Sequence, residues 1–323
     1  MSVRQEGVVG ERLDGALKKK EIETERLFAL RESKSQWKMA WDRFCRDKLA
    51  LAGTFILLFI ILMALAAPLL SKYLTHYEPQ TIELLANLKP PGYKRSDAAA
   101  IHWLGTDELG RDVLTRAIYG ARVSIGISVT TVAISLTIGT LLGAIAGFYG
   151  GFIDSMIMRF VDIMLSIPAI FLLLLIAVVF EPDLRTFSFV IASVAWMGVS
   201  RLVRGEFLSI KERDYIEAAR VVGASNARII FRHILPNATT PMIVAATLGI
   251  GNIILVETAL SYLGMGVKPP TPSWGNMLTK ASTYLYKAPH LVVIPGLLIF
   301  ITVLAVNLMG NGLRDALDPK LKE

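Results

Sequence analysis

The chain has 323 residues, of which 53% are hydrophobic and 19% charged, and its formal net charge is +7. A soluble domain averages about 45–50% apolar and about 25% charged residues. Two stretches contain no Asp, Glu, Lys or Arg, 31 residues at 123–153 and 26 residues at 288–313, and each is long enough to cross a bilayer. These features exclude a soluble enzyme, a disordered chain and a secreted domain held by disulfides, since Cys45 is the only cysteine.

Six apolar segments predict six transmembrane helices. The fourth is short, with 15 residues between Arg185 and Arg201, whose long side chains can reach back to the membrane surface. The predicted spans are Leu49–Leu70, Val123–Phe148, Ile163–Phe180, about Thr186–Ser200, about Pro241–Leu263 and about Leu291–Leu313. The sequence therefore predicts an all-α membrane protein.

The distribution of Lys and Arg predicts the orientation. The segments on the side of the two termini carry 22 of these residues, and the loops on the other side carry 10. Because cytoplasmic loops are enriched in Lys and Arg, both termini are expected in the cytoplasm, and we attribute the basic pI near 9.4 to this bias rather than to nucleic-acid binding. The expected organisation is a cytoplasmic tail at 1–48, a first span at 49–70, an extracytoplasmic loop at 72–121, a core at 123–313 with a cytoplasmic loop at 201–240, and a cytoplasmic tail at 314–323.

Two segments outside the spans have helical patterns. In residues 37–46 the apolar residues Trp37, Trp41, Phe44 and Cys45 share one helix face among basic residues, which favours a helix in the inner headgroup layer over one packed on a partner subunit. In the external loop, the charge spacing at 102–116 predicts a short solvated helix capped by Thr106. The first 48 residues are polar and do not have the pattern of a signal peptide.

Motifs for chemistry are missing from the sequence. It contains no G-x-x-x-x-G-K-[ST] phosphate-binding loop, no G-x-S-x-G elbow and no pair of histidines at metal-ligand spacing. We expect no catalytic residue, no bound metal and no cofactor on this chain. Such a chain is a conduit that needs an external source of work.

One acidic residue, Glu257, lies within the predicted fifth span. A charged group at membrane depth is costly, so such residues usually face the bundle interior or water. Glu257 could contact a substrate amine or hold a gate. It could equally be hydrogen-bonded to a neighbouring helix or to a partner subunit, or lie near the external membrane surface.

The loop 201–240 contains a predicted helix–turn–helix. Its first helix, Glu212–Val222, would carry ion pairs of Glu217 with Arg213 and Arg220, and Gly223 would end it with a positive φ. Ser225 would cap a second helix, Asn226–Ile234, which Pro236 would stop.

The residues E-A-A-x-x-x-G at 217–223, followed by Leu-Pro at 235–236, resemble the loop motif of the membrane-spanning subunits of ATP-binding-cassette importers. The departure from that motif is His233, which stands where the family usually has Ile. The segments 102–125, 261–278 and 307–320 are similar to the second permease subunit of dipeptide and oligopeptide importers, and the resemblance covers roughly residues 35–320.

The resemblance implies a type I importer permease in a prokaryotic plasma (inner) membrane. A second, homologous permease subunit, two ATPase subunits that hold ATP and Mg, and an extracytoplasmic substrate-binding protein would be its partners. The residues expected to couple to the ATPase are Glu217, Ala218, Ala219, Gly223, Leu235 and Pro236. Peptide is the expected substrate; nickel chelates, haem, opines or oligosaccharides stay as alternatives, and an intramembrane enzyme, an exporter or a secondary transporter are the competing classes.

Overall fold

The structure, a computed structural model, describes residues 36–94, 100–281 and 283–318. The remaining parts of the predicted tails, 1–35 and 319–323, lie outside the described residues. Within the described ranges the chain forms helices and two isolated β-bridges, Tyr93 with His102 and Thr106 with Asp112.

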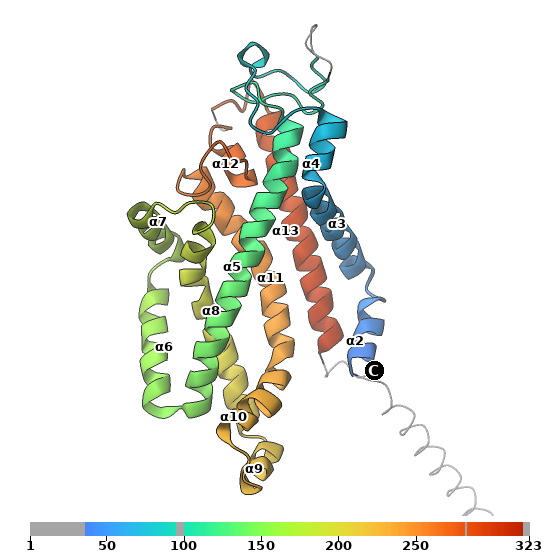
Figure 1. Cartoon of the computed structure of the whole chain (residues 1–323). Helices are drawn as coiled ribbons and strands as arrows, with labels where there is room; N and C mark the ends of the chain where they lie inside the picture. The colour runs from blue at the N-terminus through green and yellow to red at the C-terminus, as the bar shows by residue number, and fades with distance from the viewer. Residues whose placement is uncertain (1–35, 95–99, 282, 319–323) are drawn as a thin grey trace, which may run out of the picture.

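Five long helices form the bundle (Figure 1). They are α3 (Lys48–Leu65), α5 (Val113–Tyr149), α8 (Phe187–Lys211), α11 (Leu235–Tyr262) and α13 (His290–Leu317). Each is long and apolar enough to cross a membrane, α11 as part of a continuous helical run from Asn226, and a bent pair of helices makes a sixth candidate. The predicted all-α membrane fold is confirmed.

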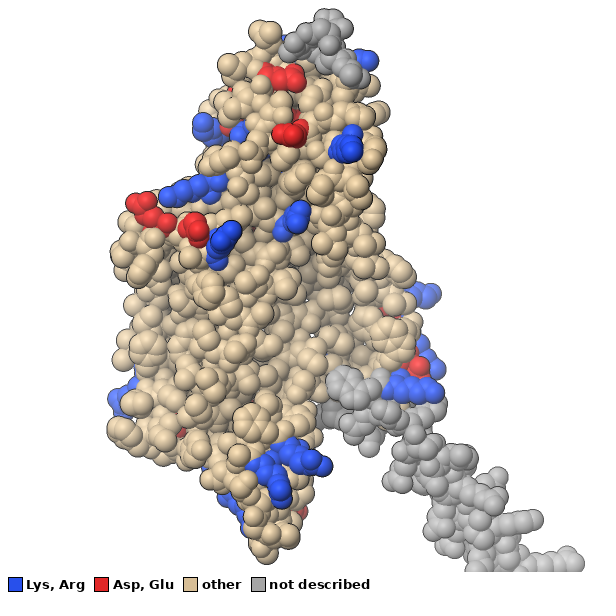
Figure 2. Space-filling model, in the orientation of Figure 1, with Lys and Arg blue, Asp and Glu red and all other residues tan. Residues whose placement is uncertain are grey.

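The shorter elements lie at the ends and sides of this bundle. They are α2 (Gln36–Phe44), α4 (Ala67–Leu70), η1 (Ser71–Thr75), η2 (Leu84–Ala86), α6 (Gly151–Ser166), α7 (Ala169–Phe180), α9 (Asp214–Val221), α10 (Asn226–Arg228), η3 (Ile229–Ile234) and α12 (Trp274–Leu278). Helices α2 and α9 and the last residues of α13 lie at one end of the bundle, whereas the loop between η1 and α5 lies at the other end together with α12 (Figure 1). On the face drawn in Figure 2, charged side chains gather toward these two ends and leave a broad belt without them.

The third predicted span, Ile163–Phe180, is not one straight helix. It falls in the pair α6 and α7, which meet at an angle of 90°. The bend lies at Ile167 and Pro168, between the two helices. Ile167 has an extended backbone because the following proline disfavours a helical conformation in the residue before it. The bent pair packs against α5 and α8 and counts as a single candidate span.

Further boundaries differ from the sequence expectation. The second span begins at Val113, ten residues before the predicted Val123, so the end of the predicted loop 72–121 is helical. The first span breaks after Leu65, since Pro68 lies in the first turn of the separate helix α4 and cannot donate a backbone hydrogen bond to the preceding turn. The predicted fourth span is part of the much longer α8, which continues through Arg201 and Arg204 to Lys211. These two arginines form ion pairs with Asp162 and Asp154 of α6, so both charges are partnered where the helix leaves the apolar belt.

The helix predicted at 102–116 is wrong. Gly105 and Gly110 have φ of +79° and +75°, which places the chain in tight turns rather than in a helix. The Thr106 hydroxyl donates to the carbonyl oxygen of Ala86 and accepts the N–H of Lys89, so it does not cap a helix at 102–116. The helix that follows, α5, starts at Val113, where Asp112 accepts the N–H of Thr115 at 2.8 Å.

Helix α2 confirms the predicted helix near residues 37–46 and splits its apolar residues between two environments. Phe44 is buried in a cluster with Ala50 and Ala316, whereas Trp41 is 65% exposed. Arg43 also donates to the carbonyl oxygen of Asp318. Helix α2 therefore packs against the C-terminal end of α13 and is hydrogen-bonded to the residue that follows it.

Candidate functional site

Helix α9, Asp214–Val221, forms the tip of the molecule opposite the α12 end (Figure 1). Gly223 follows it with φ +84°, as predicted. The N–H of Gly223 donates to Arg220 O and the N–H of Ala224 donates to Ala219 O, which is the Schellman pattern of a helix C-terminus. The predicted helix 212–222 and its glycine stop are thus confirmed to within two residues.

A buried cluster holds α9 against the bundle. Ile216 is 0% exposed and packs with Phe148 from the end of α5, Phe207 from α8 and Ile229 from η3. The guanidinium of Arg220 lies 6.0 Å from the centre of the Phe148 ring. This cluster attaches α9 to the ends of α5 and α8.

The opposite face of α9 is open to solvent. Glu217 and Ala218 are exposed, and the low side chain of Ala218 leaves the surface accessible. Val221 and Val222 are 88% and 87% exposed at the end of the helix. These two adjacent apolar side chains are available for contact with another molecule.

Sequence reasoning missed Val221 and Val222. The sequence does contain an indication of this exposed pair, because two β-branched apolar residues lie at the end of a polar helix, directly before a glycine. Phe231, 69% exposed on the following turn, was missed as well.

The ion pairs predicted for Glu217 are wrong. Among the described residues, neither Arg213 nor Arg220 forms an ion pair with Glu217. Arg213 lies before the helix with an extended backbone, and Arg220 turns toward Phe148. The Glu217 carboxylate is therefore left to face outward.

Pro236 does not stop the second helix of the loop. Ser225 caps that helix as predicted, by accepting the N–H of Arg228. The chain then continues through the π-helical turn η3 and α11 to Tyr262. Because proline cannot donate to the carbonyl four residues earlier, the turn before Pro236 widens and the helix goes on. Leu235 is half-buried and Pro236 exposed at this junction.

Glu257 lies far from α9 and is 0% exposed. Ser124 of α5 donates to its Oε2 at 3.0 Å, and Ser261 donates to its Oε1 at 2.7 Å. The structure thus places this carboxyl in a hydrogen-bonded contact between two helices.

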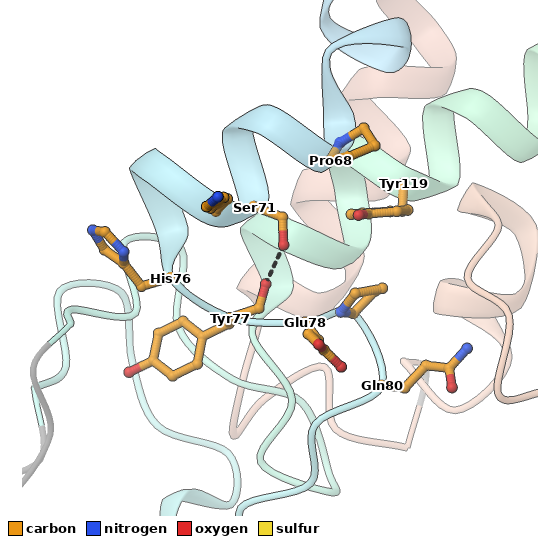
Figure 3. A pocket seen from close by; sticks show the side chains of 9 residues that line it. Pro68, Ser71, His76, Tyr77, Glu78, Gln80 and Tyr119 are labelled. Atoms are coloured by element: carbon orange, nitrogen blue, oxygen red, sulfur yellow. Dashed lines mark hydrogen bonds between the residues drawn. The ribbon is translucent and has the colours of Figure 1, made fainter.

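Two hollows open at the α12 end. The first, of about 650 Å³, lies between η1 and α5, and Figure 3 shows Tyr119 on one wall with His76, Tyr77 and Glu78 along the other. The Ser71 hydroxyl donates to the carbonyl oxygen of Tyr77 and holds this loop against the helix (Figure 3). The second, of about 310 Å³, separates residues 107–116 from the segment after α11.

The acidic residues near membrane depth do not form a catalytic pair. Asp162 is bound to Arg201, and Glu257 is bound to two serines. Among the described residues, no three His, Cys, Asp or Glu side chains gather as a metal site would require. The geometry defines a multi-span membrane protein with an exposed helical tip at one end, packed on the ends of α5 and α8.

Comparison with known proteins identifies the class. The model of the family "binding-protein-dependent transport system inner membrane component" matches residues 139–323, and that of the "N-terminal TM domain of oligopeptide transport permease C" matches residues 35–91. The chain belongs to this family of transport-system membrane components. It is the permease subunit of an ATP-binding-cassette importer, a translocation component rather than an enzyme.

Curated relatives match over most of their length. The chain is 42% identical to the dipeptide transport system permease protein DppC of Alkalihalophilus pseudofirmus, over 89% of this chain and 91% of that protein. It is 40% identical to the oligopeptide transport system permease protein OppC of Bacillus subtilis, over 91% and 92%. It is 38% identical to the glutathione transport system permease protein GsiD of Pectobacterium atrosepticum, over 90% and 93%.

Among solved structures, the chain is similar to one from the MetNI methionine ABC transporter in an inward-facing conformation. The TM-score is 0.53 at 20% identity, over 64% of this chain and 97% of that chain. At this identity the likeness supports the fold, which is the fold predicted from the loop motif.

Proposed function

We propose that α9 is the coupling helix of this permease and docks into a cleft of a partner ATPase subunit. The observation that carries this proposal is the combination of an exposed apolar end, Val221 and Val222, with the buried anchor Ile216. Glu217, Ala218 and Ala219 form the docking face, and Gly223 with Leu235 and Pro236 sets the direction of the chain beneath it. ATP and Mg are held by the ATPase, whose closure pulls on α9 and thereby on α5 and α8.

The substrate is a small peptide. Relatives whose names refer to dipeptide, oligopeptide and glutathione transport match the chain nearly end to end, and these ligands all contain peptide-type amide bonds. An extracytoplasmic binding protein delivers the peptide to the end that carries α12, and a second, homologous permease completes the pathway. Two ATPase subunits lie at the α9 end, in the cytoplasm, where both termini of the chain also lie.

The test is uptake by the complete importer reconstituted in proteoliposomes with its binding protein. Labelled dipeptide should accumulate only with ATP and the binding protein, and a Val221→Asp, Val222→Asp double variant should lose the ATPase subunits on purification. Accumulation of a nickel chelate, haem or an oligosaccharide in place of peptide would replace the substrate and leave the coupling proposal standing. Retention of both ATPase subunits and full uptake by the double variant would refute the coupling role of α9.

A further inference from the structure

The buried carboxyl of Glu257 connects three separate elements at the external end. Its Oε2 accepts a hydrogen bond from Ser124 Oγ, which in turn accepts the N–H of Trp274 in α12 at 3.2 Å. Its Oε1 accepts from Ser261 Oγ, which accepts the N–H of Val267 at 3.1 Å. Each carboxyl oxygen thus reaches the segment 263–281 through one serine.

That segment is wedged between the helices. Trp274 is 0% exposed, and its indole N–H donates to the carbonyl oxygen of Ala117 on α5 at 3.0 Å. A Cβ atom on Gly275 would lie 2.7 Å from the Cβ of Ser261 on α11. Asn276 closes the segment on itself by donating to the carbonyl oxygens of Val267 and Thr271. At Trp274 and Gly275 the segment is therefore in close contact with both α5 and α11.

The contact between α5 and α11 extends below this point. A Cβ atom on Gly249 of α11 would lie 3.5 Å from Cγ2 of Val132 on α5. This contact is eight residues from Ser124 on one helix and eight from Glu257 on the other, so the two antiparallel helices stay in contact over about two turns. Separating them would remove the Ser124 donor from a carboxyl that has no access to water, whereas the Ser261 donor lies on α11 itself and would stay.

We infer that Glu257 is a positioning residue that pins α12 to α5 and α11, so that the external ends of these three elements move as one body during transport. The pathway then opens at the edge of this body, against another subunit, and not between α5 and α11. The side chain does not contact the peptide, because it is enclosed on all sides. This inference rests on the proposed ATP-driven import. It goes beyond that proposal by naming the ends of α5, α11 and α12 as a part of the permease that does not change shape during transport.

The first test uses the reconstituted importer with its binding protein and compares Glu257→Ala with Glu257→Gln. The amide keeps the shape and can bond both serines, so uptake per ATP should stay within about threefold of the parent. The alanine variant should assemble but lose about tenfold in peptide imported per ATP, with raised ATPase activity when the binding protein is left out. A merely structural role would lower the yield of complex without raising this binding-protein-independent activity.

A matched control is Glu181→Ala. Glu181 carries an exposed carboxylate 3.7 Å from Lys268 of the same segment, so it contacts the wedge from outside. This variant should keep parental coupling. Equal coupling in Glu257→Ala and the parent would overturn the inference, and absence of ATP-dependent uptake in the parent would instead overturn the proposed function.

The second test does not depend on the stability of the Glu257 variants. Val132→Cys and Gly249→Cys, in a chain with Cys45→Ser and with cysteine-free partners, place two thiols across the seam of α5 and α11. A Cβ atom at 249 would lie 3.5 Å from a γ atom of residue 132, so we expect oxidation to form the disulfide and to leave uptake within about twofold of the reduced complex. Failure of the disulfide to form, or loss of uptake on oxidation that a reductant restores, would show that the two helices part.

Discussion

A Cβ atom on Gly143 of α5 would lie 2.4 Å from the backbone carbonyl oxygen of Ser200 on α8. Gly139 and Gly147, one turn away on either side, face α8 in the same way, with Cβ contacts of 2.6 and 2.7 Å. Small residues at this spacing let two helix backbones approach closely in a membrane. The glycines thus set the distance between the two helices that carry the α9 anchor.

Replacing Gly143 by Ala should therefore push α5 away from α8. Overpacking of this kind costs about 1–3 kcal/mol, so the melting temperature of the purified complex should fall by several degrees. Gly126→Ala on the same helix is the matched control, since a Cβ atom there meets nothing within 4 Å. Equal melting temperatures for the two variants would contradict this close approach.

The exposed valines at the end of α9 predict a specific loss of ATPase binding. Burial of one valine side chain contributes about 1.5–3 kcal/mol, so Val221→Ser should weaken docking by about tenfold to a hundredfold. The measurement is binding of the ATPase subunits to the permease pair as a function of concentration. Tyr286→Ser, which removes a 100% exposed aromatic ring at the other end, should leave this binding unchanged.

The contacts of Asp107 predict how stable the loop between η1 and α5 is. Its Oδ2 lies 2.6 Å from Arg111 Nε and 3.5 Å from Arg116 Nε, and both arginines are buried. Asp107→Asn would leave two guanidinium groups without their shared carboxylate, and breaking a buried pair costs about 3–5 kcal/mol.

Limited proteolysis of the purified complex is the measurement for this variant, and cleavage between residues 76 and 112 should become faster. Glu108→Gln is the control, because its carboxylate is more exposed and lies 3.5 Å from Arg111. Similar cleavage rates for the two variants would show that the shared carboxylate does not hold the loop.

The long apolar segments made the spans predictable, because a run of 31 residues without a charge has few other uses. The ends of the helices were harder to predict. The sequence pattern predicts a helix capped by Thr106, whereas the chain turns at Gly105 and Gly110 and begins α5 after Asp112.

Features of the candidate site that depend on neighbouring residues in the sequence were predicted correctly. Features that depend on contacts with distant parts of the chain were not. Gly223 follows from helix-ending preferences alone. Arg220 contacts Phe148, more than seventy residues earlier in the chain. Its spacing to Glu217 therefore predicted an ion pair that the structure does not contain. Pro236 was predicted to end the helix, but the preceding π-helical turn accommodates a residue without a backbone N–H and the helix continues. The sequence alone does not predict such a turn.

Gly223 itself provides the last prediction, about how α9 couples to the rest of the chain. A β-branched residue at φ +84° is strained by about 1–2 kcal/mol, and since nothing lies within 4 Å of a Cβ atom there, the strain is purely in the backbone. Gly223→Val should therefore change the direction of the chain between α9 and α10 without a steric clash. Gly223→Asn should be tolerated, because asparagine enters the left-handed region more easily.

The measurement is substrate-stimulated ATPase activity and uptake in the reconstituted complex, beside co-purification of the ATPases. Gly223→Val should keep insertion and pairing of the permeases and lose coupling. Glu217→Ala should be milder, because the carboxylate has no ion pair within the described chain and an exposed charge contributes about 1 kcal/mol at most. Normal uptake and full coupling in Gly223→Val would mean that the segment from α9 to α10 is only a connector. A loss in Glu217→Ala as large as that in Gly223→Val would instead mean that the carboxylate is buried against the ATPase on docking.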